Sequence, residues 1–174
     1  MIEKVFSIDI AAPVQRVWDE ITRRGAPHPA VFGSYLHVDL RPGATMSYRN
    51  RSGARTLVLG EVLDVQAPRR LVHTFRFSLE SDEPTVVAWE LTEHQGGTRV
   101  TITHSRLVEE SRTARKISGG WPRILRYYKQ FIETGTVPMG KRIGNAVMGA
   151  MCCMLPKRTR TENAMKLNLK VPAA

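Results

Sequence analysis

Six stretches of this sequence alternate apolar with polar or small residues, and most of the turns between them are short. The six stretches are residues 34–40, 45–50, 56–65, 70–77, 85–94 and 98–105. In the last two, Val87, Trp89 and Leu91 share one parity, and Val100 and Ile102 share another. A period of two places successive side chains on opposite faces of a β-strand. The pattern therefore predicts an antiparallel sheet with one apolar face and one face in water.

One more strand and two helices complete the predicted body of the protein. Residues 2–10 alternate as a strand does, and residues 13–22 repeat apolar side chains at helical spacing. A longer helix is predicted over 121–134, where Gly135 follows as a C-terminal cap. Its apolar face consists of Trp121, Ile124, Leu125, Tyr128, Phe131 and Ile132. We expect this helix to cover the apolar face of the sheet, so that Phe131→Asp would unfold or strongly destabilise the protein.

The end of the chain, residues 137–174, is basic and contains an apolar run. Ile143–Leu155 is apolar apart from Asn145, and Pro156 is expected to end the run. As a helix it would be about 20 Å long, too short for a hydrocarbon core about 30 Å thick. We expect a tail helix that packs against the body or a second subunit, and a chain shortened to Gly140 should lose stability or change its oligomeric state. The less favoured alternative is a membrane-surface segment, whose basic residues would be Lys141, Arg142, Lys157, Arg158 and Arg160.

Two adjacent cysteines, Cys152 and Cys153, lie inside this apolar run. Neighbouring residues of a helix point about 100° apart, so two thiolates would not converge on a metal ion. A disulfide between them would be strained, because adjacent Cα atoms lie about 3.8 Å apart and disulfides prefer about 4.4 to 6.8 Å. We therefore predict reduced cysteines that serve as small packing residues, and no metal site.

The distribution of charge argues against nucleic acid as a partner. The net charge is +10, but residues 141–174 hold seven Lys or Arg and one acid, whereas the body mixes both signs. The body lacks zinc-finger spacing and the glycine-aromatic signature of RNA-binding sheets. The sequence shows no charged and then apolar leader and no apolar run of about 18 residues. We therefore expect a cytoplasmic protein that does not bind nucleic acid.

Four segments carry a resemblance to a known superfamily: IAAPVQRVWDEIT, GEVLDVQAPRRLVHTF, VAWELTEHQGGTRVTITHS and GWPRILRYYKQFIETG. In this order they resemble the helix-grip (START-related, SRPBCC) superfamily, and most closely its bacterial proteins similar to the activator of a heat-shock chaperone ATPase. The resemblance implies an α+β fold in which a curved antiparallel sheet of about six to seven strands wraps a long C-terminal helix. An extra tail helix would follow. The predicted ligand-binding domain is 1–136, and the basic, apolar extension is 137–174.

The sequence contains no common catalytic or cofactor-binding motif such as GxSxG, a Walker loop, GxGxxG or HExxH. We therefore predict no catalytic residue and no cofactor. By strand parity, His73 shares a face with Phe75, and His104 shares one with Ile102, so both histidines should point inward. They are either polar anchors or acid–base groups for a ligand, or hydrogen-bonded core residues, which we favour. The candidate ligand-binding residues are Tyr48, His73, Phe75, Trp89, His104, Tyr128 and Phe131.

Three functions stay open. The favoured one is a carrier or sensor of a small hydrophobic molecule, held between the sheet and the C-terminal helix with one polar group near His73 or His104. The second is an enzyme similar to polyketide cyclases or dehydratases, which would need both histidines and Tyr48 to converge on one cavity. The third is a co-chaperone that stimulates a chaperone ATPase through its surface. The expected partners are a small hydrophobic ligand and a second copy of the chain, with a membrane surface as the weaker alternative.

Overall fold

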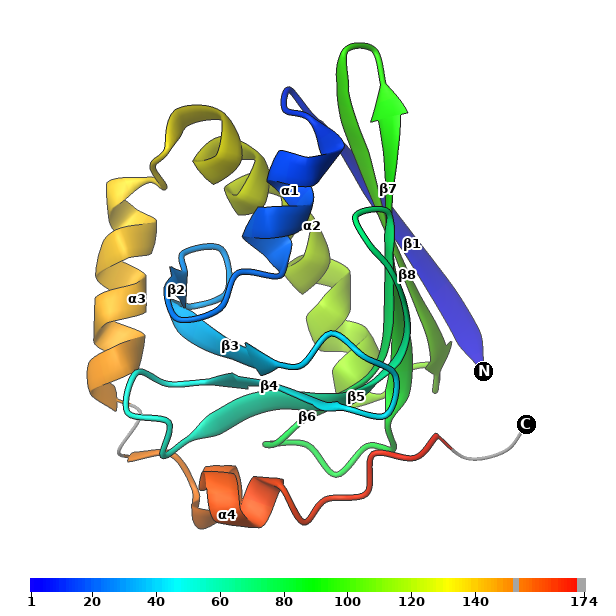
Figure 1. The fold of residues 1–174 in the computed structure, drawn as a ribbon. Helices are drawn as coiled ribbons and strands as arrows, with labels where there is room; N and C mark the ends of the chain where they lie inside the picture. The colour runs from blue at the N-terminus through cyan, green and yellow to red at the C-terminus, as the bar shows by residue number, and fades with distance from the viewer. Residues whose placement is uncertain (152–153, 172–174) are drawn as a thin grey trace.

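The computed structural model, which describes residues 1–151 and 154–171, has eight antiparallel strands in one curved sheet. The strand order is β1-β8-β7-β6-β5-β4-β3-β2, so only β1 pairs with a strand distant in sequence. The strands are β1 (Ile2–Ile10), β2 (Pro27–His28), β3 (Ser34–Val38), β4 (Thr45–Arg49), β5 (Thr56–Gln66), β6 (Arg70–Phe77), β7 (Thr85–His94) and β8 (Gly97–Leu107). The sheet wraps around the long helix α2 (Arg112–Thr134) (Figure 1). The predicted helix-grip fold is confirmed, with one very short strand, β2, that the loop-like sequence around it concealed.

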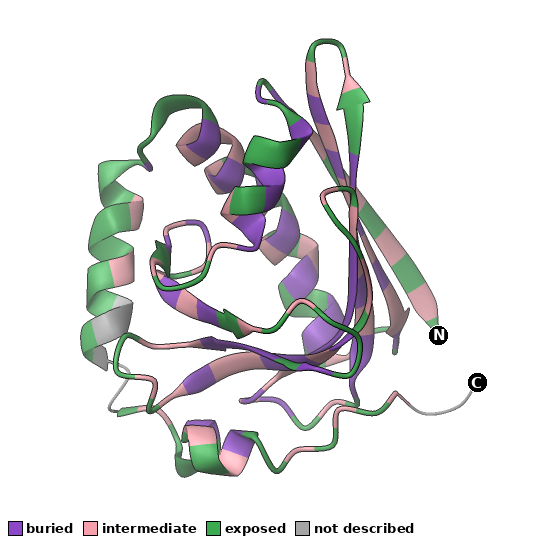
Figure 2. Cartoon of the chain, in the orientation of Figure 1, coloured by how far each residue is buried: buried purple, intermediate pink, exposed green. Residues whose placement is uncertain are grey.

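The apolar face predicted from alternation is the inner face of the sheet. Buried and partly exposed residues alternate along β7 and along most of β8 (Figure 2). The strand register places Leu71, Trp89, Ile102 and Phe6 in one row across four strands. Because the row lies on one face, its side chains face the same core and belong to one apolar cluster.

Helix α1 (Val14–Ile21) covers part of this core beside α2. Its buried side chains are Val14, Val17, Trp18 and Ile21. These are the four residues whose spacing predicts the helix. Pro13 precedes the first turn in an extended conformation, which suits a residue that cannot donate a backbone hydrogen bond.

Helix α2 begins nine residues earlier than the sequence predicts. Ser111 caps it by accepting a hydrogen bond from the backbone N–H of Ala114 at 3.1 Å. Gly119, Gly120 and Pro122 lie inside the helix. Because glycine and proline destabilise a helix interior, the sequence predicts a start after Gly120. Tertiary packing overrides this local preference, because Ala114 and other buried residues in the early turns continue the apolar stripe.

Phe131 lies at the edge of the helix stripe instead of at its centre. Its side chain is only partly buried, and the guanidinium of Arg23 lies over its ring at 5.3 Å. An Asp there would meet a cation near the surface, so the expected unfolding by Phe131→Asp is not supported by this geometry. The centre of the stripe is formed by Leu125 and Tyr128, which are both almost fully buried.

The tail helix α3 (Met139–Met151) lies along one side of the molecule (Figure 1). The Asn145 side-chain amide donates to the carbonyl of Pro29 at 3.0 Å, and the Lys141 ammonium lies 4.5 Å from the centre of the Phe32 ring. The helix starts at Met139, four residues before the predicted apolar run. The side chains that contact the body here, Asn145 and Lys141, are polar. Exposed apolar residues on α3 are Met139, Ile143 and Val147. The contacts of Asn145 and Lys141 place one side of the helix on the body, and packing of the other side on a second subunit stays a prediction.

The chain beyond α3 is held on the outside of the body. It forms a short 3-10 turn η2 (Lys157–Thr159) and a short helix α4 (Thr161–Ala164). Thr161 donates its N–H to Ala54 at 3.0 Å and its hydroxyl to Gly53 at 2.6 Å, both backbone carbonyls of the β4–β5 connection. This segment therefore packs on the body.

The predicted role of Cys152 and Cys153 falls outside the described residues. Within the described part of the chain, no helix has both the length and the hydropathy required to cross a membrane.

β5 lies close against β6 at Gly60. A Cβ atom at this position would lie 1.8 Å from the carbonyl oxygen of Thr74. The hydroxyl of Thr74 accepts a hydrogen bond from the N–H of Glu61 at 2.8 Å, which holds the two strands together beside the glycine. The position therefore requires glycine because any side chain would collide with the neighbouring backbone.

We expect Gly60→Ala to lower the free energy of unfolding by about 2–3 kcal/mol, because the two strands must separate to admit the methyl group. Urea denaturation measures this change. Gly119→Ala is a matched control, since a Cβ there meets nothing within 4 Å and alanine favours a helix by up to about 1 kcal/mol. An unchanged unfolding midpoint for Gly60→Ala would show that the close approach is not a constraint.

Candidate functional site

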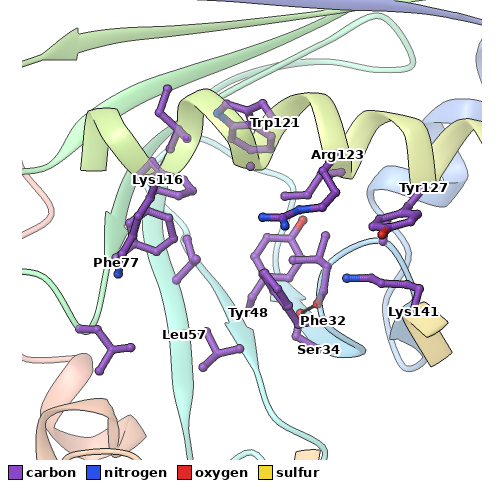
Figure 3. A pocket seen from close by; sticks show the side chains of 18 of the residues that line it. Phe32, Ser34, Tyr48, Leu57, Phe77, Lys116, Trp121, Arg123, Tyr127 and Lys141 are labelled. Atoms are coloured by element: carbon purple, nitrogen blue, oxygen red, sulfur yellow. Dashed lines mark hydrogen bonds between the residues drawn. The ribbon is translucent and has the colours of Figure 1, made fainter. Parts of the chain in front are cut away.

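A cavity of about 460 Å³ lies between α2 and the inner face of strands β4 to β7. Phe75 and Trp89 contribute aromatic side chains from the sheet. Figure 3 shows two further aromatic side chains of the wall, Tyr48 from the sheet and Trp121 from α2. The loop around Phe32 and the helix α3 close one side. Most of the wall is aromatic or aliphatic, so it suits an apolar molecule.

The structure brings together three of the seven candidate ligand-binding residues. Tyr48, Phe75 and Trp89 line the cavity. The other four, His73, His104, Tyr128 and Phe131, are not among its lining residues. Contact of any of the seven with a ligand stays a prediction. The hydrogen bonds of the three buried residues among the other four, His73, His104 and Tyr128, show what they do in the fold.

His104 links the sheet to α2 through hydrogen bonds. The indole N–H of Trp121 donates to Nδ1 at 2.9 Å, so Nε2 carries the ring proton and donates to the hydroxyl of Thr85 at 2.7 Å. The Thr85 hydroxyl in turn donates to the carbonyl of Phe75 at 3.1 Å. This chain joins three strands and one helix. Burial lowers the pKa of His104 to about 3, so the ring is neutral near pH 7.

His28 forms a second buried link, between the β2 region and α2. Its Nε2–H donates to the carbonyl of Arg23 at 2.7 Å, which leaves Nδ1 to accept from the Tyr128 hydroxyl at 2.9 Å. Burial lowers the pKa of His28 to about 4. No alternation or helical spacing in the sequence around His28 indicates this role.

Tyr48 has its ring edge against His28, with ring centres 5.6 Å apart. Burial raises the pKa of Tyr48 to about 12, and the hydroxyl of Tyr128 beside it acts in the opposite direction. At neutral pH the Tyr48 hydroxyl is therefore protonated and can act as a hydrogen-bond donor at the cavity wall.

His73 occupies the inner face of β6, where parity places it. Its Nδ1–H donates to the carbonyl of Thr74 at 2.7 Å. Nε2 is buried and has no hydrogen-bond partner among the described residues. Burial lowers the pKa of His73 to about 4, so this ring is also neutral. This hydrogen bond to a backbone carbonyl agrees with the favoured hypothesis, that His73 is a hydrogen-bonded core residue.

Three cationic side chains line the cavity, and sequence analysis missed all of them. Lys116 and Arg123 come from α2, and Lys141 comes from α3 (Figure 3). Lys116, Gly120, Arg123 and Tyr127 recur at helical spacing, so an earlier predicted start of α2 would have revealed this second face. For Lys141 no local sequence signal was available, because it lies in the tail.

Residues 11–133 match the family described as Activator of Hsp90 ATPase homolog 1-like protein. The chain belongs to this family. The matched residues run from the start of α1 almost to the end of α2, so they include the sheet apart from β1 and most of the cavity wall. A search of curated proteins finds no match to the sequence.

Solved structures with the same fold include other proteins of this kind. The Aha1 dimer from Colwellia psychrerythraea has a TM-score of 0.62 at 16% identity, and covers 79% of this chain and 100% of its own. PFC0360w, an HSP90 activator from Plasmodium falciparum, has a TM-score of 0.61 at 19% identity, and the match covers 78% of this chain and 97% of PFC0360w. CalU16 from Micromonospora echinospora has a TM-score of 0.61 at 20% identity, and the match covers 87% of this chain and 86% of CalU16. At these identities the likeness establishes the fold.

We expect stability to fall as the pH is lowered from 7 to 5. His28, His73 and His104 have folded pKa values of about 4, 4 and 3, whereas an unfolded histidine titrates near 6.5. The unfolded chain therefore binds protons first, and each histidine removes up to about 1.4 kcal/mol per pH unit below that value. Glu20, whose pKa burial raises, acts in the opposite direction.

Thermal melting monitored by circular dichroism between pH 7 and 5 checks this expectation. His73→Leu should flatten the pH dependence by about one third, because it removes one of three buried sites. His37→Gln is the comparison variant: His37 is exposed, and slight burial and the nearby Arg49 only modestly lower its pKa, so this variant should flatten the dependence less than His73→Leu does. A melting temperature that is constant over this range would contradict the assignment of three neutral, buried histidines.

Proposed function

We propose that this protein binds a small, mostly apolar molecule in the cavity between the sheet and α2, as a carrier or sensor. The observation that supports it is the cavity itself, which at about 460 Å³ lies in the range of small-molecule sites, about 300–1,000 Å³. Its wall is mostly apolar and offers water few hydrogen bonds, so an apolar molecule that displaces this water gains packing contacts with the wall.

The enzyme alternative needs His73, His104 and Tyr48 to converge on one cavity. Of these three, only Tyr48 lines it. His104 already has partners at both ring nitrogens, and reaching a substrate would break the link between the sheet and Trp121. This arrangement supports binding over acid–base catalysis as the proposal for this site.

A second candidate function is stimulation of a chaperone ATPase. The description of the family and that of the Plasmodium falciparum HSP90 activator favour it. Such an activity would use the surface, so it can be separated from ligand binding by variants of the cavity wall. A second copy of the chain is the proposed protein partner, in line with the dimer described for the Colwellia psychrerythraea protein.

We expect Gly120→Leu to abolish binding of apolar molecules without unfolding the protein. Gly120 lines the cavity, and a Cβ there meets nothing within 4 Å. Leucine would therefore enter open space while also favouring the helix by about 0.8–1 kcal/mol. Native mass spectrometry before and after organic extraction detects a co-purified molecule, and the neutral dye N-phenyl-1-naphthylamine reports binding by fluorescence.

Gly119→Leu is the matched control, because Gly119 is exposed, is not a lining residue, and also has open space at its Cβ position. It should gain the same helix preference and keep ligand and dye. Equal dye binding by both variants would refute the cavity as the binding site. If the parent and Gly120→Leu stimulate a purified Hsp90 ATPase equally, the second function, stimulation of a chaperone ATPase, is favoured.

A further inference from the structure

The three cations that line the cavity differ in how their charges are balanced. Lys116 forms an ion pair with Glu80, a carboxylate that is only 4% exposed. Arg112 also approaches this carboxylate, at 3.6 Å. Lys116 thus has its counter-charge within the protein and is not free to recognise a ligand.

Arg123 and Lys141 have no such counter-charge. Within residues 1–151 and 154–171, neither forms an ion pair with a carboxylate. The Lys141 ammonium lies between two aromatic faces, 4.5 Å from the ring centre of Phe32 and 4.8 Å from that of Tyr127. Aromatic faces stabilise a cation but leave its N–H groups available to an acceptor.

The two cations come from different helices and reach toward the same part of the cavity. Figure 3 shows the guanidinium of Arg123 and the ammonium of Lys141 directed into the space beside Tyr48. Partial burial lowers the pKa of Lys141, and the positive charge of Arg123 lowers it further. The two groups therefore repel each other, and an anion between them would replace that repulsion with attraction at both.

We infer that the ligand is an anionic amphiphile, whose apolar body fills the aromatic cavity and whose carboxylate or similar acidic group binds Arg123 and Lys141. This inference rests on the proposed binding function and names its ligand class. Arg offers a planar pair of donors that matches an acidic group, and Lys adds a compact charge. The polar group of the ligand is thereby assigned to the rim of the cavity and not to His73 or His104.

Two dyes with the same apolar body test this inference. 8-Anilinonaphthalene-1-sulfonate carries a sulfonate, and N-phenyl-1-naphthylamine is its neutral counterpart. The parent protein should bind the sulfonate dye at least about tenfold more tightly, the ratio that one charge-assisted contact of about 1.4 kcal/mol provides. Arg123→Gln/Lys141→Gln should remove this difference and leave the affinity for the neutral dye unchanged.

Arg126→Gln/Arg142→Gln is the charge-matched control, because it also removes one cation from α2 and one from α3, and both arginines are exposed and are not lining residues. It should leave both affinities as in the parent, and circular dichroism verifies that every variant is folded. Gly120→Leu should abolish binding of both dyes, which locates them in the cavity.

The outcomes separate the two proposals. Suppose that both dyes bind the parent with equal affinity, do not bind Gly120→Leu, and bind Arg123→Gln/Lys141→Gln as tightly as the parent. The anionic ligand class is then overturned and the cavity proposal stands. If the parent binds neither dye, or if Gly120→Leu binds both as the parent does, the cavity proposal fails and the anionic class fails with it.

Discussion

A single helix cannot cover an eight-stranded sheet, and this mismatch in width determines the rest of the structure. A helix with its side chains is about 10 Å wide, whereas eight strands about 4.8 Å apart span about 34 Å when flat. The sheet curves around α2, and α2 packs mainly against β1 and, more lightly, β8. The inner face of β4 to β7 therefore stands away from the helix, and the cavity lies in that space.

Where helix and sheet do meet, buried polar groups join them through fully paired hydrogen bonds. His104 uses both ring nitrogens to link Trp121 to Thr85, and His28 uses both of its own to link Tyr128 to backbone. Neutral histidines suit this task, because one nitrogen donates while the other accepts. Since both ring nitrogens of His28 and of His104 already have partners, the charged groups of Arg123 and Lys141 are better placed to bind a polar group of the ligand.

The sequence predicts the fold well because the information needed is local. Alternation over residues 85–94 and 98–105 defines β7 and β8 closely, and the spacing from Val14 to Ile21 defines α1. The candidate site depends on where segments meet in space, which local patterns do not contain. Parity indicates that His104 points inward, but only the packing of α2 shows that Trp121 takes its free nitrogen. Arg123 and Lys141 line the same cavity because Lys141 of α3 lies against the ring of Tyr127 of α2.

The wall of the cavity draws on both sides of the predicted boundary at residue 136. Lys141 and Leu155 line it from the tail, beyond the segment that matches the family. The shared fold explains why the cavity exists, because every sheet of this width around one helix meets the same mismatch. It does not determine the ligand, since the rim combines Arg123 of the common domain with Lys141 of the extension. A relative with a different tail would keep the apolar interior but present different charges to the polar end of its ligand.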